Sequence, residues 1–285
     1  MGQKIVLAGV NFTDQSLPVL RDDPILSAGS LALVDFGHSL GGIDAVPSNG
    51  DPVPNIAWSI ASDLVESESV SPVIVANYDG AGMAAELSAK GGLHVIKSQV
   101  GDTNTTRFVV KLPTAIIAYM LANKSNKFFL SMWHEVTRKA ESNSLPIAAI
   151  AHSSYSVDFI LNMQSNGAPG GSAANRLGLS SNLNPSAATG TAKQQVAVNG
   201  STGTVSSLVY ADLFIFGGVP STGPLTGAVN KGGSHILYRC YLEDLTVSGR
   251  TYEEVKAIDD QLFAAAFSPG GKFYGDTFTD PATLP

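Results

Sequence analysis

With 285 residues, of which 44% are hydrophobic and only 14% charged, the chain is long enough for one large β-sandwich with an appendage or for two modest domains. The formal net charge of -7, without a concentrated run of Lys and Arg, argues against nucleic-acid binding, because the phosphate backbone requires clustered positive charge. Cys240 is the only cysteine, which excludes an intrachain disulfide and a thiolate metal cluster. The N-terminal apolar run is too short for a secretory signal, and no stretch approaches the roughly 20 apolar residues of a membrane helix, so we expect folding in the cytoplasm.

The first ninety residues alternate short apolar runs with turn signals. Prolines at positions 18, 24, 47, 52 and 54 interrupt both helices and sheet ladders. This pattern predicts an extended arm that lies along another surface. Two short helices are expected within it. Asn55 would cap the first, and the second would cover residues 81–89 before Gly91 and Gly92 stop it.

A turn within this arm, Gly37-His38-Ser39-Leu40-Gly41-Gly42, matches the nucleophile elbow of α/β-hydrolases, which exposes its serine between a strand and a helix. Residues 31–36 could supply the strand, but the proline-containing residues 43–52 leave space for scarcely one helical turn. We therefore interpret the segment as a flexible turn and keep a serine hydrolase using Ser39 as an alternative. Its general base would be one of four later histidines: His94, His134, His152 or His235.

From residue 93 onward the pattern changes to regular strands separated by turn-rich loops. The segments that we expect to be strands are residues 93–97, 107–112, 127–138, 147–153, 157–163, 176–179, 193–198 and 205–216. Pro113 is expected to open a short helix between two of them. Many strands at short spacing favour an antiparallel sandwich over a doubly wound parallel sheet.

Several acidic and histidine-containing segments invite a catalytic or metal-binding interpretation. Residues 133–138 begin like the helix of a zinc protease, but arginine replaces the second histidine and the segment alternates like a strand. Glu243 and Asp244 are adjacent and point to opposite strand faces, whereas Glu66 and Glu68 lie in a Ser-rich segment, so neither pair suits a glycosidase and a solvated surface is expected for both. No calcium-loop motif surrounds the remaining candidates, Asp102, Asp158, Asp212, Asp244 and Asp276. The sequence therefore predicts no catalytic, cofactor-binding or metal-binding residue.

Residues 234–267 read as a long strand, a turn and a helix. One strand face is predicted to carry Ile236, Tyr238, Cys240 and Leu242. The other would carry Arg239, Tyr241 and Glu243, which predicts a strand buried mainly on one side. Thr251 and Glu254 form a capping box that opens the helix. Its apolar stripe should close the core through Val255, Ile258, Leu262, Phe263 and Ala266, and the aromatic residues of 272–278 should pack the tail back on the sandwich.

The end of this region, residues 242–247 followed by 251–255, resembles the terminal strand, turn and helix of laminin-G-like, concanavalin-A-like jelly rolls. The aromatic-rich residues 128–133 resemble the strand that crosses the core in laminin-G-like domains. As a whole, the chain resembles structural proteins of tailed bacteriophages that place such a jelly roll behind an extended N-terminal region. The resemblance implies a role in particle assembly.

These observations predict a mainly β chain: an antiparallel β-sandwich (jelly roll) with a C-terminal helix and an extended, partly helical N-terminal region. The expected division is an attachment arm over residues 1–90 and a sandwich over residues 91–285. We expect a non-enzymatic structural component of a bacteriophage virion, in the capsid decoration or the tail, that binds other virion proteins and further copies of itself. No cofactor, membrane or nucleic acid is expected as a partner. A lectin-like module that binds a host-surface glycan is the second alternative, beside the hydrolase.

Overall fold

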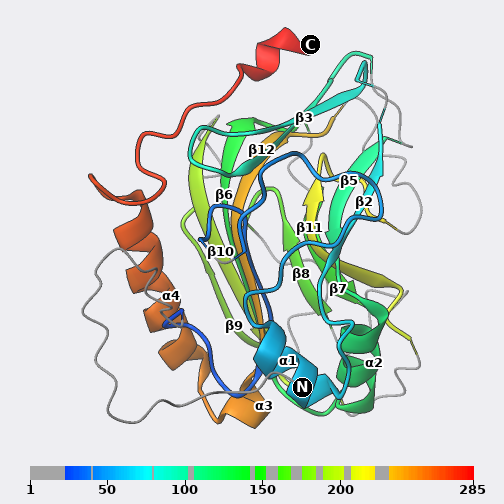
Figure 1. The fold of residues 1–285 in the computed structure, drawn as a ribbon, viewed down its shortest axis with the longest axis vertical. Coiled ribbons are helices and arrows are strands. Elements are labelled where there is room, and N and C mark those ends of the chain that lie inside the picture. Colours follow the sequence, from blue (N-terminus) through cyan, green and yellow to red (C-terminus); the bar gives the residue numbers. More distant parts are fainter. Residues whose placement is uncertain are drawn as a thin grey trace, which may run out of the picture.

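The computed structural model describes residues 23–39, 41–78, 80–101, 106–141, 145–151, 160–167, 175–183, 189–201, 207–221 and 231–285. Two antiparallel β-sheets face each other, and the long helix α4 (Tyr252–Phe267) lies along the outer side of the larger sheet (Figure 1). The predicted fold class is confirmed: the chain is mainly β, with two antiparallel sheets and a C-terminal helix. The jelly-roll order of its strands stays a prediction.

The larger sheet, called here the first sheet, has seven strands with β12 (Ser234–Asp244) near its centre. Along one edge, β12 pairs with β6 over ten registered positions. Its other edge is shared, since β4 pairs with its beginning and β1 with its end. These direct neighbours of β12 are β1 (Ser30–Asp35), β4 (Leu93–Lys97) and β6 (Phe128–Arg138). Beyond β4 lies β3 (Met83–Leu87), and beyond β6 lie β10 (Gly190–Val198) and then β9 (Arg176–Ser181).

The second sheet has five strands in the order β2-β5-β11-β7-β8. These strands are β2 (Val73–Asn77), β5 (Arg107–Lys111), β7 (Pro146–Ala151), β8 (Ile160–Gln164) and β11 (Tyr210–Phe216). Each of the eight strand segments predicted from residue 93 onward contains a strand. The main apolar core lies between the sheets and draws on both, for example through Leu130 and Leu242 of the first and Phe214 and Phe216 of the second.

Strand β12 differs from its prediction in two ways. All eleven of its residues are buried, so it is covered on both faces. In addition, the pairing with β6 shifts between Leu237 and Arg239, which makes a β-bulge. The extra residue reverses the faces of the strand: Ile236 and Tyr238 pack in an outer cluster, whereas Cys240 and Leu242 belong to the core between the sheets. The prediction that these residues share one face is therefore wrong, because alternation breaks at a bulge.

The helices lie at the ends and on one outer face of the sandwich. Helices α1 (Trp58–Val65) and α2 (Thr114–Ala122) sit side by side at one end, close to the short helix α3 (Leu245–Ser248), as Figure 1 shows. The capping box of α4 is confirmed, since Thr251 and Glu254 exchange both hydrogen bonds. The apolar stripe of α4 packs on the outer face of the first sheet, and the chain ends in a 3-10 turn (Pro281–Thr283).

The described part of the N-terminal region is built into both sheets. Strand β1 pairs with β12, and β2 pairs with β5. Residues 83–87 form strand β3 where a short helix was predicted. Strand β3 joins β4 in a hairpin, and Gly91 in its turn has a φ of 84°. The domain boundary expected at residue 90 therefore falls inside this hairpin. The N-cap of α1 is Ala57, two residues after the predicted Asn55, but the Asn55 side chain accepts a hydrogen bond from Ala57 N at 3.0 Å in the turn that leads into the helix. The same side chain bonds the backbone of Leu33 and Val70 and so ties three segments together.

Candidate functional site

The turn that carries Ser39 lacks the setting of a nucleophile elbow. The strand before it, β1, is antiparallel to β12, whereas an elbow follows a strand of a mostly parallel sheet. The turn closes on itself through hydrogen bonds from Gly42 N to His38 O (2.6 Å) and from Ile43 N to Phe36 O (3.2 Å). Ser39 is exposed, and the next helix in the described chain begins only at Trp58. The geometry gives the hydrolase alternative no support.

Three of the four candidate imidazoles are held within the first sheet. His94 bonds Glu86 (2.8 Å) and Thr137 (2.9 Å) through its two ring nitrogens. His134 and His235 lie against each other, with ring centroids 5.6 Å apart, and both are fully or almost fully buried. The fourth, His152, lies outside the described residues. The hydrogen bonds and ring contacts found for these three imidazoles go to residues of the two sheets and of the C-terminal tail, so the sequence motif is not matched by a base held on its turn.

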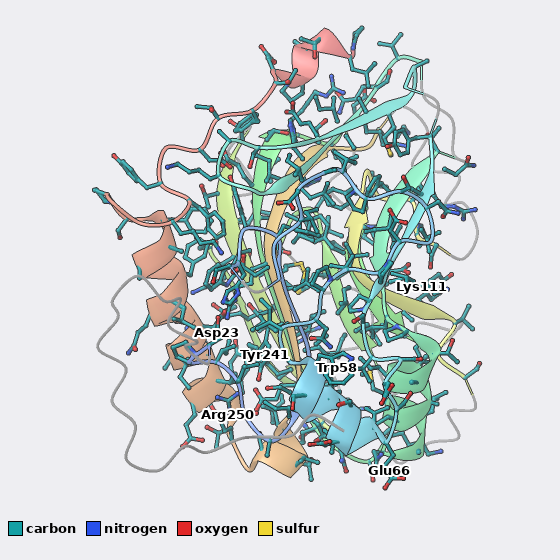
Figure 2. The ribbon with its side chains drawn as sticks, in the orientation of Figure 1. Asp23, Trp58, Glu66, Lys111, Tyr241 and Arg250 are labelled. Atoms are coloured by element: carbon teal, nitrogen blue, oxygen red, sulfur yellow. The ribbon has the colours of Figure 1, made fainter. Side chains whose placement is uncertain are left out.

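The expectation of a solvated surface is wrong for Glu243 and Asp244, both of which are 0% exposed. Glu243 accepts hydrogen bonds from Arg250 Nε (2.8 Å) and from the hydroxyl of Tyr241 (3.0 Å). Asp244 accepts one from Tyr119 (2.9 Å) and also caps helix α3. Figure 2 shows Tyr241 and Arg250 on the side of the first sheet where α4 begins. Glu243 thus holds the link between α3 and α4, and Asp244 holds α2 and α3, at the end of β12.

Glu66 and Glu68, in contrast, are exposed as predicted. Glu66 ends helix α1 in the left-handed conformation, with a φ of 54°. Residues 133–138 are confirmed as part of a strand, β6. Among the described residues, no group of three or more His, Cys, Asp or Glu side chains is placed to share a metal ion. Of the aspartates considered for calcium, Asp102 and Asp158 lie outside the described residues, while Asp212 bonds Ser221.

A buried ionic network centred on Arg239 joins segments from both ends of the chain. The guanidinium forms a bidentate pair with Asp23 at 2.7 Å and lies 3.4 Å from Asp35, which in turn accepts a hydrogen bond from Lys272 at 2.6 Å. The same guanidinium stacks over the ring of Trp133 at 4.8 Å. Although burial opposes ionisation, Arg239 holds the pKa of Asp23 below its usual value. The network therefore fixes the segment before β1 and the segment after α4 on one face of β12.

A second buried polar cluster fastens α4 to the first sheet. Asp259, which is 0% exposed, accepts hydrogen bonds from Ser131 (2.6 Å), Trp133 Nε1 (2.9 Å) and Gln195 (2.5 Å). Burial raises the pKa of Asp259, although these donors oppose the rise. Sequence reasoning missed this residue. A signal was present, because Asp259 lies four residues from Val255 and from Phe263 and so falls on the apolar stripe of the helix.

The C-terminal tail is packed on the sheet as predicted. The ring of Phe273 lies 4.5 Å from that of Tyr238, and Phe278 packs edge-on against His94. Asp276 accepts hydrogen bonds from Tyr238 (3.0 Å) and from the backbone of Lys90 (2.8 Å). The tail thus adds a second layer to the outer face of the first sheet, beyond the end of α4 (Figure 1).

Two surface hollows lie along helices α1 and α2. A hollow of about 450 Å³ between them is lined mainly by small or apolar side chains: Leu64, Val65, Ala115, Ala118, Tyr119 and Ala122, with Glu66 and Asn123 at its margin. A smaller hollow of about 250 Å³ lies along α1 between Trp58 and Glu66, which Figure 2 labels at the two ends of that helix. Trp58 is 37% exposed, and its indole N–H donates to the carbonyl of Glu68 at 3.1 Å.

No protein family matches the chain, and no curated protein shows significant similarity to it. Within the described residues, no helix is both long and apolar enough to cross a membrane.

Proposed function

We propose that the chain is a non-enzymatic structural component of a bacteriophage virion, placed in the capsid decoration or the tail, and that it acts by binding other virion proteins and further copies of itself. The resemblance of the whole chain to structural proteins of tailed bacteriophages, which place a jelly roll behind an extended N-terminal region, supports the virion. The main support for a structural role is that the buried charged side chains bind other parts of the same chain. Arg239, Asp259 and Glu243 hold terminal segments and helices on the sheet, where a catalytic protein would point such groups into an open cleft.

The end of the sandwich formed by α1 and α2 is the surface that best suits a subunit contact. Helix α2 contains no charged residue, and Thr114, Ala118 and Ala122 are exposed along it at intervals of four. Small side chains at this spacing let another surface approach the helix backbone closely. Uncharged, partly apolar surface is tolerable in a soluble chain when partner subunits cover it.

Two experiments test this proposal. Antibodies raised against the purified chain should label intact particles of the phage that encodes it in electron micrographs, and unlabelled particles that lack the chain by mass spectrometry would refute a place in the virion. The contact is tested by light scattering of Ala118→Glu, which should shift the chain to smaller assemblies. Ala265→Glu is the matched control, because Ala265 is an exposed alanine on a different helix. Equal assembly sizes for the two variants would refute the α2 contact.

One observation favours a second function, a lectin-like module that binds a glycan. The hollow at Trp58 contains a partly exposed indole beside the hydroxyls of Ser59 and Ser62 and the carboxylate of Asp63. An indole can stack on a sugar ring, and the neighbouring oxygens can accept hydrogen bonds from the sugar hydroxyls. In a glycan screen, Trp58→Ala should then abolish binding, whereas Tyr274→Ala, which removes an aromatic ring that is 51% exposed elsewhere, should not. A wild-type chain that binds no glycan would end this alternative.

A further inference from the structure

Three polar side chains face the interior between the two sheets. Gln194 of β10 and His134 of β6 are 0% exposed, and His235 of β12 is 2% exposed. The ring of Phe214, on the opposite sheet, lies 5.6 Å from that of His134 and 6.1 Å from that of His235. Gln194 is paired with Met132, which belongs to the core between the sheets, so its amide points to the same side.

The register of the strands places these side chains in one diagonal row. Gln194 pairs with Met132, two residues before His134, and His235 pairs with Val136, two residues after it. Diagonal neighbours in a sheet are about 7–8 Å apart, which long side chains can bridge only in part. The rings of His134 and His235 have their centroids 5.6 Å apart. The row therefore crosses three adjacent strands.

The polar atoms of this row have unmet hydrogen-bonding capacity. Both ring nitrogens of His134, Nδ1 of His235 and both amide atoms of Gln194 are buried without a hydrogen-bond partner in the described part of the chain. Buried polar groups in folded proteins are almost always paired with protein or with ordered water, because an unpaired one keeps its full desolvation cost. Several such atoms in one row call for a shared partner.

We propose that the sandwich contains an internal hydration site in which ordered water molecules bridge Gln194, His134 and His235. Water is neutral, and it both donates and accepts, as a row of amide and imidazole groups requires. Two hydrogen bonds of about 2.9 Å through one water span up to about 5.8 Å, which matches the spacing of diagonal neighbours whose side chains lean toward each other. This inference goes beyond the proposed virion role and does not depend on it.

A metal ion fits the same row less well. It would bind imidazole nitrogens but leave the N–H groups of Gln194 without an acceptor. It would also bring a positive charge among apolar residues, and among the described side chains no carboxylate or thiolate completes a set of three ligands there.

The count of long-lived internal water molecules tests the proposal. Magnetic relaxation dispersion of water nuclei should show at least one fewer such molecule in the double variant Gln194→Leu/His134→Phe than in the wild-type chain. Met132→Leu changes the same part of the core without removing a hydrogen-bonding nitrogen or oxygen and should keep the wild-type count. An equal count in the double variant and the wild type would overturn the hydration site.

The wild-type chain alone provides a second test in case the double variant does not fold. A high-resolution crystal structure should show water oxygens within about 3.2 Å of His134 and Gln194. Direct hydrogen bonds among the three side chains with no water between them, or a metal ion on the imidazoles, would each refute the proposal.

Discussion

Acidification is expected to destabilise the sandwich through its two buried core histidines. Burial lowers the pKa of His235 from 6.5 to about 4, and it lowers the pKa of His134 well below its usual value. In the unfolded chain both imidazoles titrate near about 6.5, so below that pH the unfolded state binds more protons than the folded state. The contribution of these neutral imidazoles to the unfolding free energy is therefore fully present above about pH 6.5, and it is lost as the pH falls toward their pKa in the folded chain.

The size of the loss follows from the shift of His235. A pKa lowered by about 2.5 units, at about 1.36 kcal/mol per unit, corresponds to about 3 kcal/mol of unfolding free energy. Between about pH 6 and about pH 4.5 the slope from His235 alone should approach about 1.4 kcal/mol per pH unit, and His134 should add to it. Urea unfolding followed by tryptophan fluorescence at a series of pH values measures this slope.

A variant isolates the histidine contribution from that of the carboxylates. Asp259 acts with the opposite sign, because its pKa is raised by burial and its contribution to stability therefore increases as the pH falls. His235→Leu removes one titrating imidazole and leaves Asp259 in place, so the difference between the two slopes reports His235. Equal slopes in the variant and the wild type, or an imidazole of His235 that titrates near about 6.5 by NMR in the folded chain, would refute this reasoning.

Three further substitutions test contacts of α4 by the same urea assay. Thr251→Ala removes the capping hydroxyl of the helix and should cost about 1 kcal/mol; an unchanged midpoint would contradict the cap. Asp259→Ala leaves the indole N–H of Trp133 and the hydroxyl of Ser131 without their acceptor, while Gln195 keeps its bond to Asp260. It should cost about 3 kcal/mol, whereas a loss below about 1 kcal/mol would show that the cluster adds little. Gly178→Ala puts a methyl group 2.3 Å from the ring of Tyr252 and should cost about 1–3 kcal/mol, and a neutral effect would mean that the ring moves freely.

The sequence predicted the fold best where local signals and tertiary packing agree. The capping box at Thr251 is complete within four residues, so the helix start could be read directly. Strands such as residues 107–111 carry apolar and β-branched residues between turn signals, and they form as predicted. The helix prediction for residues 83–87 was wrong. Alanine-rich segments favour a helix locally, but pairing with β4 provides hydrogen bonds that a short helix could not outweigh.

The polar sites of the structure were harder to predict, because their partners lie far apart in the chain. Asp23 and Arg239 are separated by 216 positions, and nothing local marks either as a partner. The bulge at Tyr238 could not be predicted from the sequence either, because no glycine or proline marks the point at which the faces of β12 reverse. The motif at Ser39 shows the converse: a short pattern can match while the surrounding strand order does not.

The position of β12 has a consequence for biosynthesis. The strand that pairs with β6, β4 and β1 spans residues 234–244 and follows all three of them in the chain. A ribosome releases the chain from its N-terminus, so the first sheet lacks its central strand until residues 234–244 have been translated. Until then the edges of β1, β4 and β6 that β12 covers stay unpaired. Products truncated before residue 234 should therefore expose these unpaired strand edges and aggregate.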